Sequence, residues 1–107
     1  MADVHLTDPL GNQITLHEVT WQRHIARRHP AISLYREHVE RAITAPTIIL
    51  KSNADPDCLV YYGQCPGQFG EIQVVADIRR GFIKTAFLRL GRTAGEQLWP
   101  RSTPSKA

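Results

Sequence analysis

Residues 72–90 read IQVVADIRRGFIKTAFLRL, two apolar runs separated by an Arg-Gly pair. In the first run every second residue is apolar, at Ile72, Val74, Ala76 and Ile78, which is the period of a half-buried β-strand. Arg80-Gly81 provides a turn, and residues 82–90 form a second run rich in strand-forming residues. The stretch therefore predicts two strands joined by a tight turn.

Two more strands are predicted just before this stretch. Residues 47–51 are mostly β-branched and residues 59–62 are apolar, with a turn-forming cluster at 53–57 between them. Residues 64–70 contain Pro66 and two glycines, which indicates a loop. Because short links join the four strands, we expect an antiparallel meander.

The chain before the strands predicts a small hairpin followed by a helix. Val4–Thr7 and Gln13–Leu16 are short alternating runs on either side of the turn-forming sequence DPLGN at 8–12. A helix over residues 18–28 ends before Pro30, because proline disfavours the helical conformation at the residue before it. Its apolar face carries two residues four positions apart, Trp21 and Ile25.

A second helix is predicted over residues 33–44, with Ser33 as its N-terminal cap. Its buried stripe consists of Tyr35, Val39, Ala42 and Ile43. Helices first and strands after define an α+β fold. We expect the N-terminal small hairpin and two helices to pack on the four-stranded antiparallel β-meander.

At 107 residues the chain is expected to form one domain over residues 1–99, with Leu98-Trp99 docked and a disordered tail at 100–107. No stretch approaches the ~20 apolar residues of a membrane span, and the N-terminus lacks the features of a signal peptide. Cys58 and Cys65 bracket a predicted strand, so they are expected to stay apart as thiols. Free thiols favour a reducing, cytoplasmic location.

The most concentrated charge lies in residues 21–30, WQRHIARRHP, which hold three arginines and two histidines. The net charge is +3, and seven of the thirteen Lys and Arg residues fall within 23–28 and 79–89. Clustered positive charge attracts polyanions. The alternative is an ordinary solvated helix face and hairpin tip, and charge alone does not separate the two interpretations.

His24 and Arg28 lie four apart and share a helix face. A neutral imidazole there can take the proton of a ribose 2′-OH, an imidazolium can supply one to the leaving 5′-oxygen, and a guanidinium can hold the phosphate. The alternative for His24 is a hydrogen-bonded residue beside Trp21. His29 is a second candidate for proton transfer, or it serves only as the C-terminal cap of the helix.

The last strand offers further candidates. Alternation places Ile83, Thr85, Phe87 and Arg89 on one face, and Lys84 on the other unless the strand bulges. Thr85, Lys84 and Arg89 could bind phosphate, although Thr85 also suits a half-buried strand position. Tyr61 or Tyr62 could stack on a base, but one of them must face the core. Histidine spacing matches no metal motif, and no glycine-rich phosphate loop is present in the sequence.

Five motifs occur in a familiar order: DPLG at 8–11, WxxHIxxRHP at 21–30, ERAITxP at 40–46, YY at 61–62 and GFIKTAF at 81–87. In this series the chain resembles phage and polymorphic-toxin nucleases of the barnase–EndoU–colicin–RelE superfamily, over about residues 4–99. The resemblance implies N-terminal helices on a four-stranded antiparallel sheet, and metal-independent RNA cleavage that leaves a 2′,3′-cyclic phosphate. It implies site roles for His24 or His29, for Arg28 and for Thr85. The chain departs from the pattern at Ala31, where relatives often carry an acidic residue.

The sequence therefore predicts a cofactor-free, metal-independent endoribonuclease of the toxin or phage-effector type. The predicted catalytic residues are His24, His29, Arg28 and Thr85, and the predicted substrate-binding residues are Arg27, Lys84, Arg89 and Tyr61. The expected partners are RNA and an inhibitor (immunity) protein, with no membrane. Two alternatives remain open: a non-catalytic RNA-binding module on the same fold, and a phage or toxin protein-interaction domain.

Overall fold

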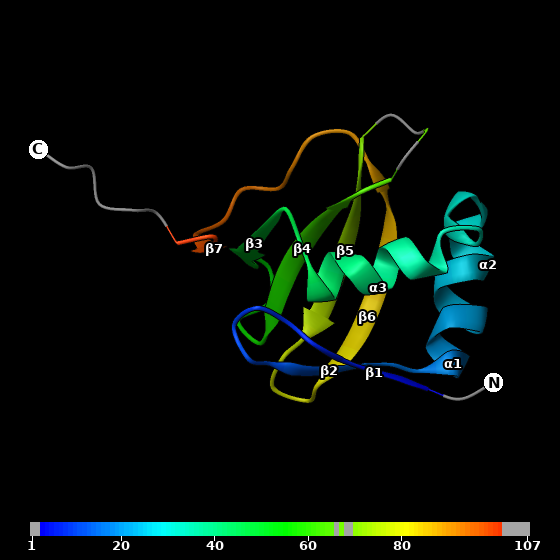
Figure 1. Ribbon diagram of the computed structural model, residues 1–107, viewed down its shortest axis with the longest axis horizontal. Helices are drawn as coiled ribbons and strands as arrows, with labels where there is room; N and C mark the ends of the chain where they lie inside the picture. Colours follow the sequence, from blue (N-terminus) through cyan, green and yellow to red (C-terminus); the bar gives the residue numbers. More distant parts are fainter. Residues whose placement is uncertain (1–2, 66, 68–69, 102–107) are drawn as a thin grey trace, which may run out of the picture.

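A computed structural model describes residues 3–65, 67 and 70–101. Its centre is one curled sheet with the strand order β1-β2-β6-β5-β4-β3-β7 (Figure 1). The strands are β1 (Val4–Thr7), β2 (Gln13–Leu16), β3 (Ile48–Lys51), β4 (Cys58–Gln64), β5 (Glu71–Asp77), β6 (Phe82–Arg89) and β7 (Gln97–Trp99). The α+β class and the N-terminal hairpin of β1 and β2 are as predicted.

The predicted four-stranded meander is the middle of this larger sheet, so the four-stranded count was wrong. Strands β3, β4, β5 and β6 pair antiparallel in that order, as expected. In addition, β2 joins β6 through one parallel pair, Thr15 with Phe82, and β7 pairs with β3. These extra contacts join segments far apart in sequence, which local alternation patterns do not record.

The turn between β1 and β2 is fastened to the sheet by a buried carboxylate. Asp8, only 4% exposed, accepts hydrogen bonds from the backbone N–H groups of Leu10 and Asn12 and from the Asn12 side chain, at 2.8–2.9 Å. The Tyr61 hydroxyl of β4 also donates to Asp8, at 2.5 Å. The DPLGN sequence therefore both makes the turn and ties the hairpin to the centre of the sheet.

Residues 18–28 form a continuous helical rod made of α1 (Glu18–Thr20), the π-helical segment η1 (Trp21–Ile25) and α2 (Ala26–Arg28). The predicted inward face is confirmed, because Trp21 and Ile25 are both buried. The rod lies beside β6, whose outer edge pairs with β2 only at Phe82 among the described residues (Figure 1). The fold thus brings the basic helix of the sequence alongside the last long strand.

The second helix begins later than predicted. The chain first makes a short 3₁₀ turn, η2 (Pro30–Ile32), which Ser33 closes by donating through its hydroxyl to the Pro30 carbonyl at 2.7 Å. Ser33 therefore does not cap a helix, and α3 (Arg36–Thr44) starts three residues further on. Its buried residues are Val39, Ala42 and Ile43, as expected.

Helix α3 crosses one face of the sheet, where the main core lies (Figure 1). The approach is close at Gly63 of β4, where an added Cβ would lie 2.9 Å from Ala42 Cβ. The other face carries a smaller apolar cluster of Leu50, Val60 and Tyr62, with Ile48 and Val75 beside it. Because α3 lies on the main-core side, it does not cover this second face.

Leu98 and Trp99 pack against the core as predicted, and β7 places them at the sheet edge. Residues 102–107 of the predicted tail, and residues 66, 68 and 69 of the predicted loop, lie outside the described residues. Cys58 and Cys65 are buried free thiols. No helix in the described part of the chain is long and apolar enough to span a membrane.

Candidate functional site

The exposed face of the helical rod carries a positively charged hollow. Arg23, His24, Arg27 and Arg28 line it around a volume of about 560 Å³, and all four residues are exposed. None of the three arginines forms an ion pair with another described residue. We call this the arginine hollow. The predicted sharing of one helix face by His24 and Arg28 is therefore seen in the structure.

His24 also lines a second, smaller hollow where the rod meets β6. Its other lining residues are Thr20, Phe82, Ile83 and Lys84, and its volume is about 220 Å³. We call this the junction hollow. It places His24 of the first helix and Lys84 of the last long strand on one concave surface.

A β-bulge in β6 decides which way Lys84 and its neighbours face. Ile83 pairs with Ala76 and Thr85 pairs with Val75, so Lys84 is the extra residue without a partner on β5. The prediction that Ile83 and Thr85 share a face is therefore wrong, because Ile83 enters the main core whereas Thr85 lies across from Val75 on the second face. The bulge also brings Lys84 to that second face, where it lines a cavity with Val75.

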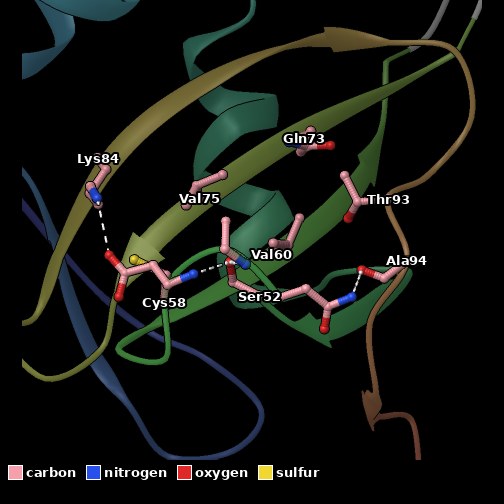
Figure 2. Close-up of a pocket in the computed structure, with 11 residues that line it drawn as sticks. Ser52, Cys58, Val60, Gln73, Val75, Lys84, Thr93 and Ala94 are labelled. Atoms are coloured by element: carbon pink, nitrogen blue, oxygen red, sulfur yellow. Dashed lines mark hydrogen bonds and ion pairs between the residues drawn. The ribbon is translucent and has the colours of Figure 1, made fainter.

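This sheet cavity has a volume of about 440 Å³ and opens on the face of the sheet away from α3 (Figure 2). The Lys84 ammonium reaches its rim and lies 3.5 Å from Asp55 Oδ2. The residues that line it are Ser52, Asn53, Ala54, Asp55, Cys58, Val60, Gln73, Val75, Lys84, Thr93 and Ala94. Lys84 thus belongs to both the junction hollow and the sheet cavity, and His24 belongs to both the junction hollow and the arginine hollow.

Polar groups inside the sheet cavity are held by hydrogen bonds. Tyr62 donates its hydroxyl to Gln73 Oε1 at 2.7 Å and accepts from the Thr93 backbone N–H at 2.8 Å. Asn53 donates through Nδ2 to the Ala94 carbonyl at 3.2 Å, which fastens the segment before β7 over the cavity (Figure 2). The cavity wall is therefore built from four separate segments, and hydrogen bonds and the Lys84–Asp55 ion pair link them to one another.

Two ionisable groups line the end of the cavity near Lys84. A hydrogen bond from the Asp57 backbone N–H, with a smaller contribution from Lys84, lowers the pKa of Asp55, so its carboxylate is ionised at neutral pH. Burial raises the pKa of the Cys58 thiol to about 11, so it remains protonated there. The cavity end therefore offers one cation, one carboxylate and one thiol.

His29 lies at the C-terminal end of the rod, where the sequence analysis placed it as a helix cap. Its backbone N–H donates to the Ile25 carbonyl at 2.9 Å, which ends α2, and its half-buried ring packs on Phe87 of β6 with 5.3 Å between ring centroids. The contact joins the end of the rod to the last long strand, as the sequence hypothesis required. His29 therefore has a clear structural role in addition to its predicted chemical one.

Two predicted substrate-binding residues lie elsewhere. Tyr61 is 0% exposed, belongs to the main core and donates to Asp8, so the prediction that it contacts substrate is corrected. Arg89 is half-buried and pairs across the sheet with Glu71, five residues beyond Lys84, or about 16 Å along an extended strand. The structure groups the predicted residues Arg27, Arg28, His24 and Lys84, with Thr85 next to Lys84, and it leaves Arg89 and Tyr61 apart.

Gln73, Asp55 and Thr93 line the sheet cavity but were not among the residues predicted from the sequence. Gln73 occupies an outward position of an alternating strand, where a polar residue is ordinary, and Asp55 lies in a turn cluster. Only the folded chain brings them to one cavity. In the described part of the chain, no three His, Cys, Asp or Glu side chains gather as metal ligands.

The chain matches no protein-family model, no curated protein and no solved structure.

Proposed function

We propose that this protein is a metal-independent endoribonuclease that cleaves RNA by attack of a 2′-hydroxyl. One observation carries the proposal: the exposed His24 lies between three arginines without ion pairs on one side and Lys84 on the other. An imidazole titrates near neutral pH and can exchange protons there. Guanidinium and ammonium groups on both sides can bind the phosphates of a polyanion that crosses it.

In this proposal the RNA backbone runs from the arginine hollow across the junction hollow. Arg27 binds one phosphate, and Arg28 and Lys84 bind the scissile one. His24 takes the proton of the 2′-hydroxyl, the 2′-oxygen attacks phosphorus, and the bond to the 5′-oxygen breaks to leave a 2′,3′-cyclic phosphate. The departing 5′-oxygen takes a proton from the His29 imidazolium or from water in the open hollow.

Charge builds up on the phosphate oxygens during this step. Lys84 and Arg28 offset that charge, which lowers the barrier more than it strengthens ground-state binding. Thr85 follows Lys84 across the bulge and lies on the second face, so its hydroxyl can donate to a phosphate oxygen. In the proposal, Lys84, Arg28 and Thr85 therefore contact the oxygens of the scissile phosphate once RNA is bound.

The test uses the purified full chain, labelled RNA of mixed sequence and EDTA in excess. Wild type cleaves the RNA, and His24→Ala lowers the rate roughly 100- to 10,000-fold, the usual contribution of a general base. His5→Ala is the matched control, because His5 is also exposed but lies on β1 and bonds to Thr15. It keeps the wild-type rate.

The two alternatives give different results in the same experiment. A non-catalytic RNA-binding module leaves the RNA intact, binds it with an affinity that falls steeply with salt, and is weakened by Arg27→Ala but not by His24→Ala. A protein-interaction domain shows neither cleavage nor salt-dependent RNA binding. Either result with folded protein rejects the nuclease proposal.

A further inference from the structure

The sheet cavity adjoins the proposed scissile phosphate at Lys84 but has no part in the proposed proton transfers. Its volume of about 440 Å³ lies within the range of small-molecule sites, about 300–1,000 Å³. Such sites combine an apolar surface with a few oriented polar groups. Here Val60 and Val75 supply the apolar surface, and Gln73 supplies the most deeply buried polar side chain.

The orientation of the Gln73 amide determines what it can bind. Its side-chain oxygen accepts the Tyr62 hydroxyl at 2.7 Å, and that same Tyr62 oxygen accepts the Thr93 N–H. The amide nitrogen is therefore the group that Gln73 can offer to a ligand, and it is a donor only. Because Gln73 is 4% exposed, an acceptor that reaches this nitrogen must project into the cavity.

The spacing along the sheet matches one nucleotide. Gln73 and Val75 are two residues apart on the same face of β5, about 6.6 Å along the strand. Lys84 lies at the bulge next to Val75, at the end of the cavity that meets the junction hollow. A phosphate at Lys84 therefore places the attached base over Val75 and Val60, with its edge toward Gln73.

Resting on the proposed nuclease function, we propose that the sheet cavity is a nucleobase subsite that selects a base with a ring carbonyl. Uracil, cytosine and guanine carry a carbonyl oxygen that projects beyond the ring and reaches the recessed Gln73 amide. The acceptors of adenine are ring nitrogens that do not project beyond its edge. An adenine base in the cavity therefore covers the Gln73 amide nitrogen and leaves this donor unpaired. An unpaired buried donor is costly, and the site therefore discriminates against adenine.

The experiment measures binding of UMP and AMP, each as the 3′- and the 5′-phosphate, by calorimetry and by NMR shifts of β5 amides. Wild type binds UMP at least about 10-fold more tightly than AMP, the factor expected when one buried donor is left unpaired. Gln73→Glu replaces the donor with an acceptor and removes or reverses that preference. Lys84→Ala is the matched control, because it weakens UMP and AMP equally and leaves their ratio unchanged.

Val75→Phe provides a second variant that does not touch the hydrogen bonds of Gln73. The larger side chain fills the cavity and weakens binding of both nucleotides, and thermal unfolding checks that each variant is folded. If Gln73→Glu does not fold, the affinities of wild type for UMP and AMP test the proposal on their own. Equal affinities of wild type for UMP and AMP, or no binding of either, overturn the inference.

Cleavage of all ribodinucleotide sequences separates this inference from the proposed function. RNA that is cut without regard to base, with Gln73→Glu fully active, keeps the nuclease and rejects the base subsite. If RNA is never cut but UMP binding depends on Gln73, the proposed nuclease activity is rejected. The sheet cavity then remains a nucleotide-binding site.

Discussion

Replacing Tyr61 with phenylalanine removes one hydroxyl from the centre of the fold and leaves the ring in place. That hydroxyl donates to Asp8, and both side chains are buried. The Asp8 carboxylate keeps its three other hydrogen bonds, all within the β1–β2 turn. The variant therefore cuts the link between the N-terminal hairpin and β4 without emptying the core.

The size of the effect follows from the kind of bond that is lost. A hydrogen bond to a charged group contributes about 1.5–3 kcal/mol to the free energy of unfolding. For a domain of this length each kcal/mol changes Tm by about 4–8 °C, so Tyr61→Phe lowers Tm by roughly 6–24 °C. Tyr62→Phe is the matched comparison, because its hydroxyl bonds only to the neutral groups of Gln73 and Thr93 and is expected to cost about 0.5–1.5 kcal/mol.

The assay is thermal unfolding followed by circular dichroism, combined with RNA cleavage at 25 °C after circular dichroism has checked that each variant is folded at that temperature. Tyr61→Phe loses more stability than Tyr62→Phe and cleaves RNA at the wild-type rate per folded molecule. Two results would refute the reasoning: an unchanged Tm, or a folded variant with lost cleavage. The second result would return Tyr61 to the substrate-binding role that the sequence predicted.

Three further predictions concern packing, acid stability and thiol reactivity. Gly63→Ala puts a Cβ 2.9 Å from Ala42 Cβ and is expected to lower the free energy of unfolding, measured in urea, by about 1–3 kcal/mol. Full wild-type stability would show that α3 can shift away from the sheet without loss of packing. A hydrogen bond from the Arg80 backbone N–H lowers the pKa of Asp77, and a second one from the Arg80 guanidinium lowers it further. The ionised Asp77 therefore stabilises the fold above about pH 4, and this stabilisation is lost as the pH falls through the lowered pKa of Asp77 in the folded protein. Asp77→Asn is thus less stable than wild type at pH 7, and urea titrations should show this gap narrowing below pH 4; a constant gap contradicts the assignment. Because burial raises the pKa of Cys58 to about 11, its alkylation at pH 8, followed by mass spectrometry of the labelled peptide, should be roughly 100-fold slower than in urea, and equal rates would contradict its burial.

The local elements of this fold could be predicted because their residues carry regular periods. Alternation in 72–78 marks β5, and the four-residue spacing of Trp21 and Ile25 marks the inner face of the rod. The π-helical segment of the rod, Trp21–Ile25, has no sequence signal of its own, because the spacing of Trp21 and Ile25 equally fits an ordinary α-helix. The joining of β2 to β6 and of β7 to β3 depends on tertiary contacts, which local patterns do not record.

The candidate site divides in the same way. The arginine hollow could be predicted because its members lie within one helical segment, where spacing sets which side chains share a face. The sequence does not predict that Lys84 faces the sheet cavity, because no glycine or proline in β6 marks the bulge that brings Lys84 to the second face. The sheet cavity could not be predicted either, because Ser52, Gln73 and Thr93 come from segments about 20 residues apart.

In the proposed function, the surface around His24 and Lys84 promotes attack by a neighbouring 2′-hydroxyl. The most direct measurement uses a DNA strand that carries a single uridine ribonucleotide, incubated with the protein in EDTA, with the products identified by mass spectrometry. We expect cleavage only after the uridine, a 2′,3′-cyclic phosphate on the upstream product, and loss of both in His24→Ala. Cleavage at 2′-deoxy positions, or an intact strand in the presence of folded wild-type protein, would contradict it.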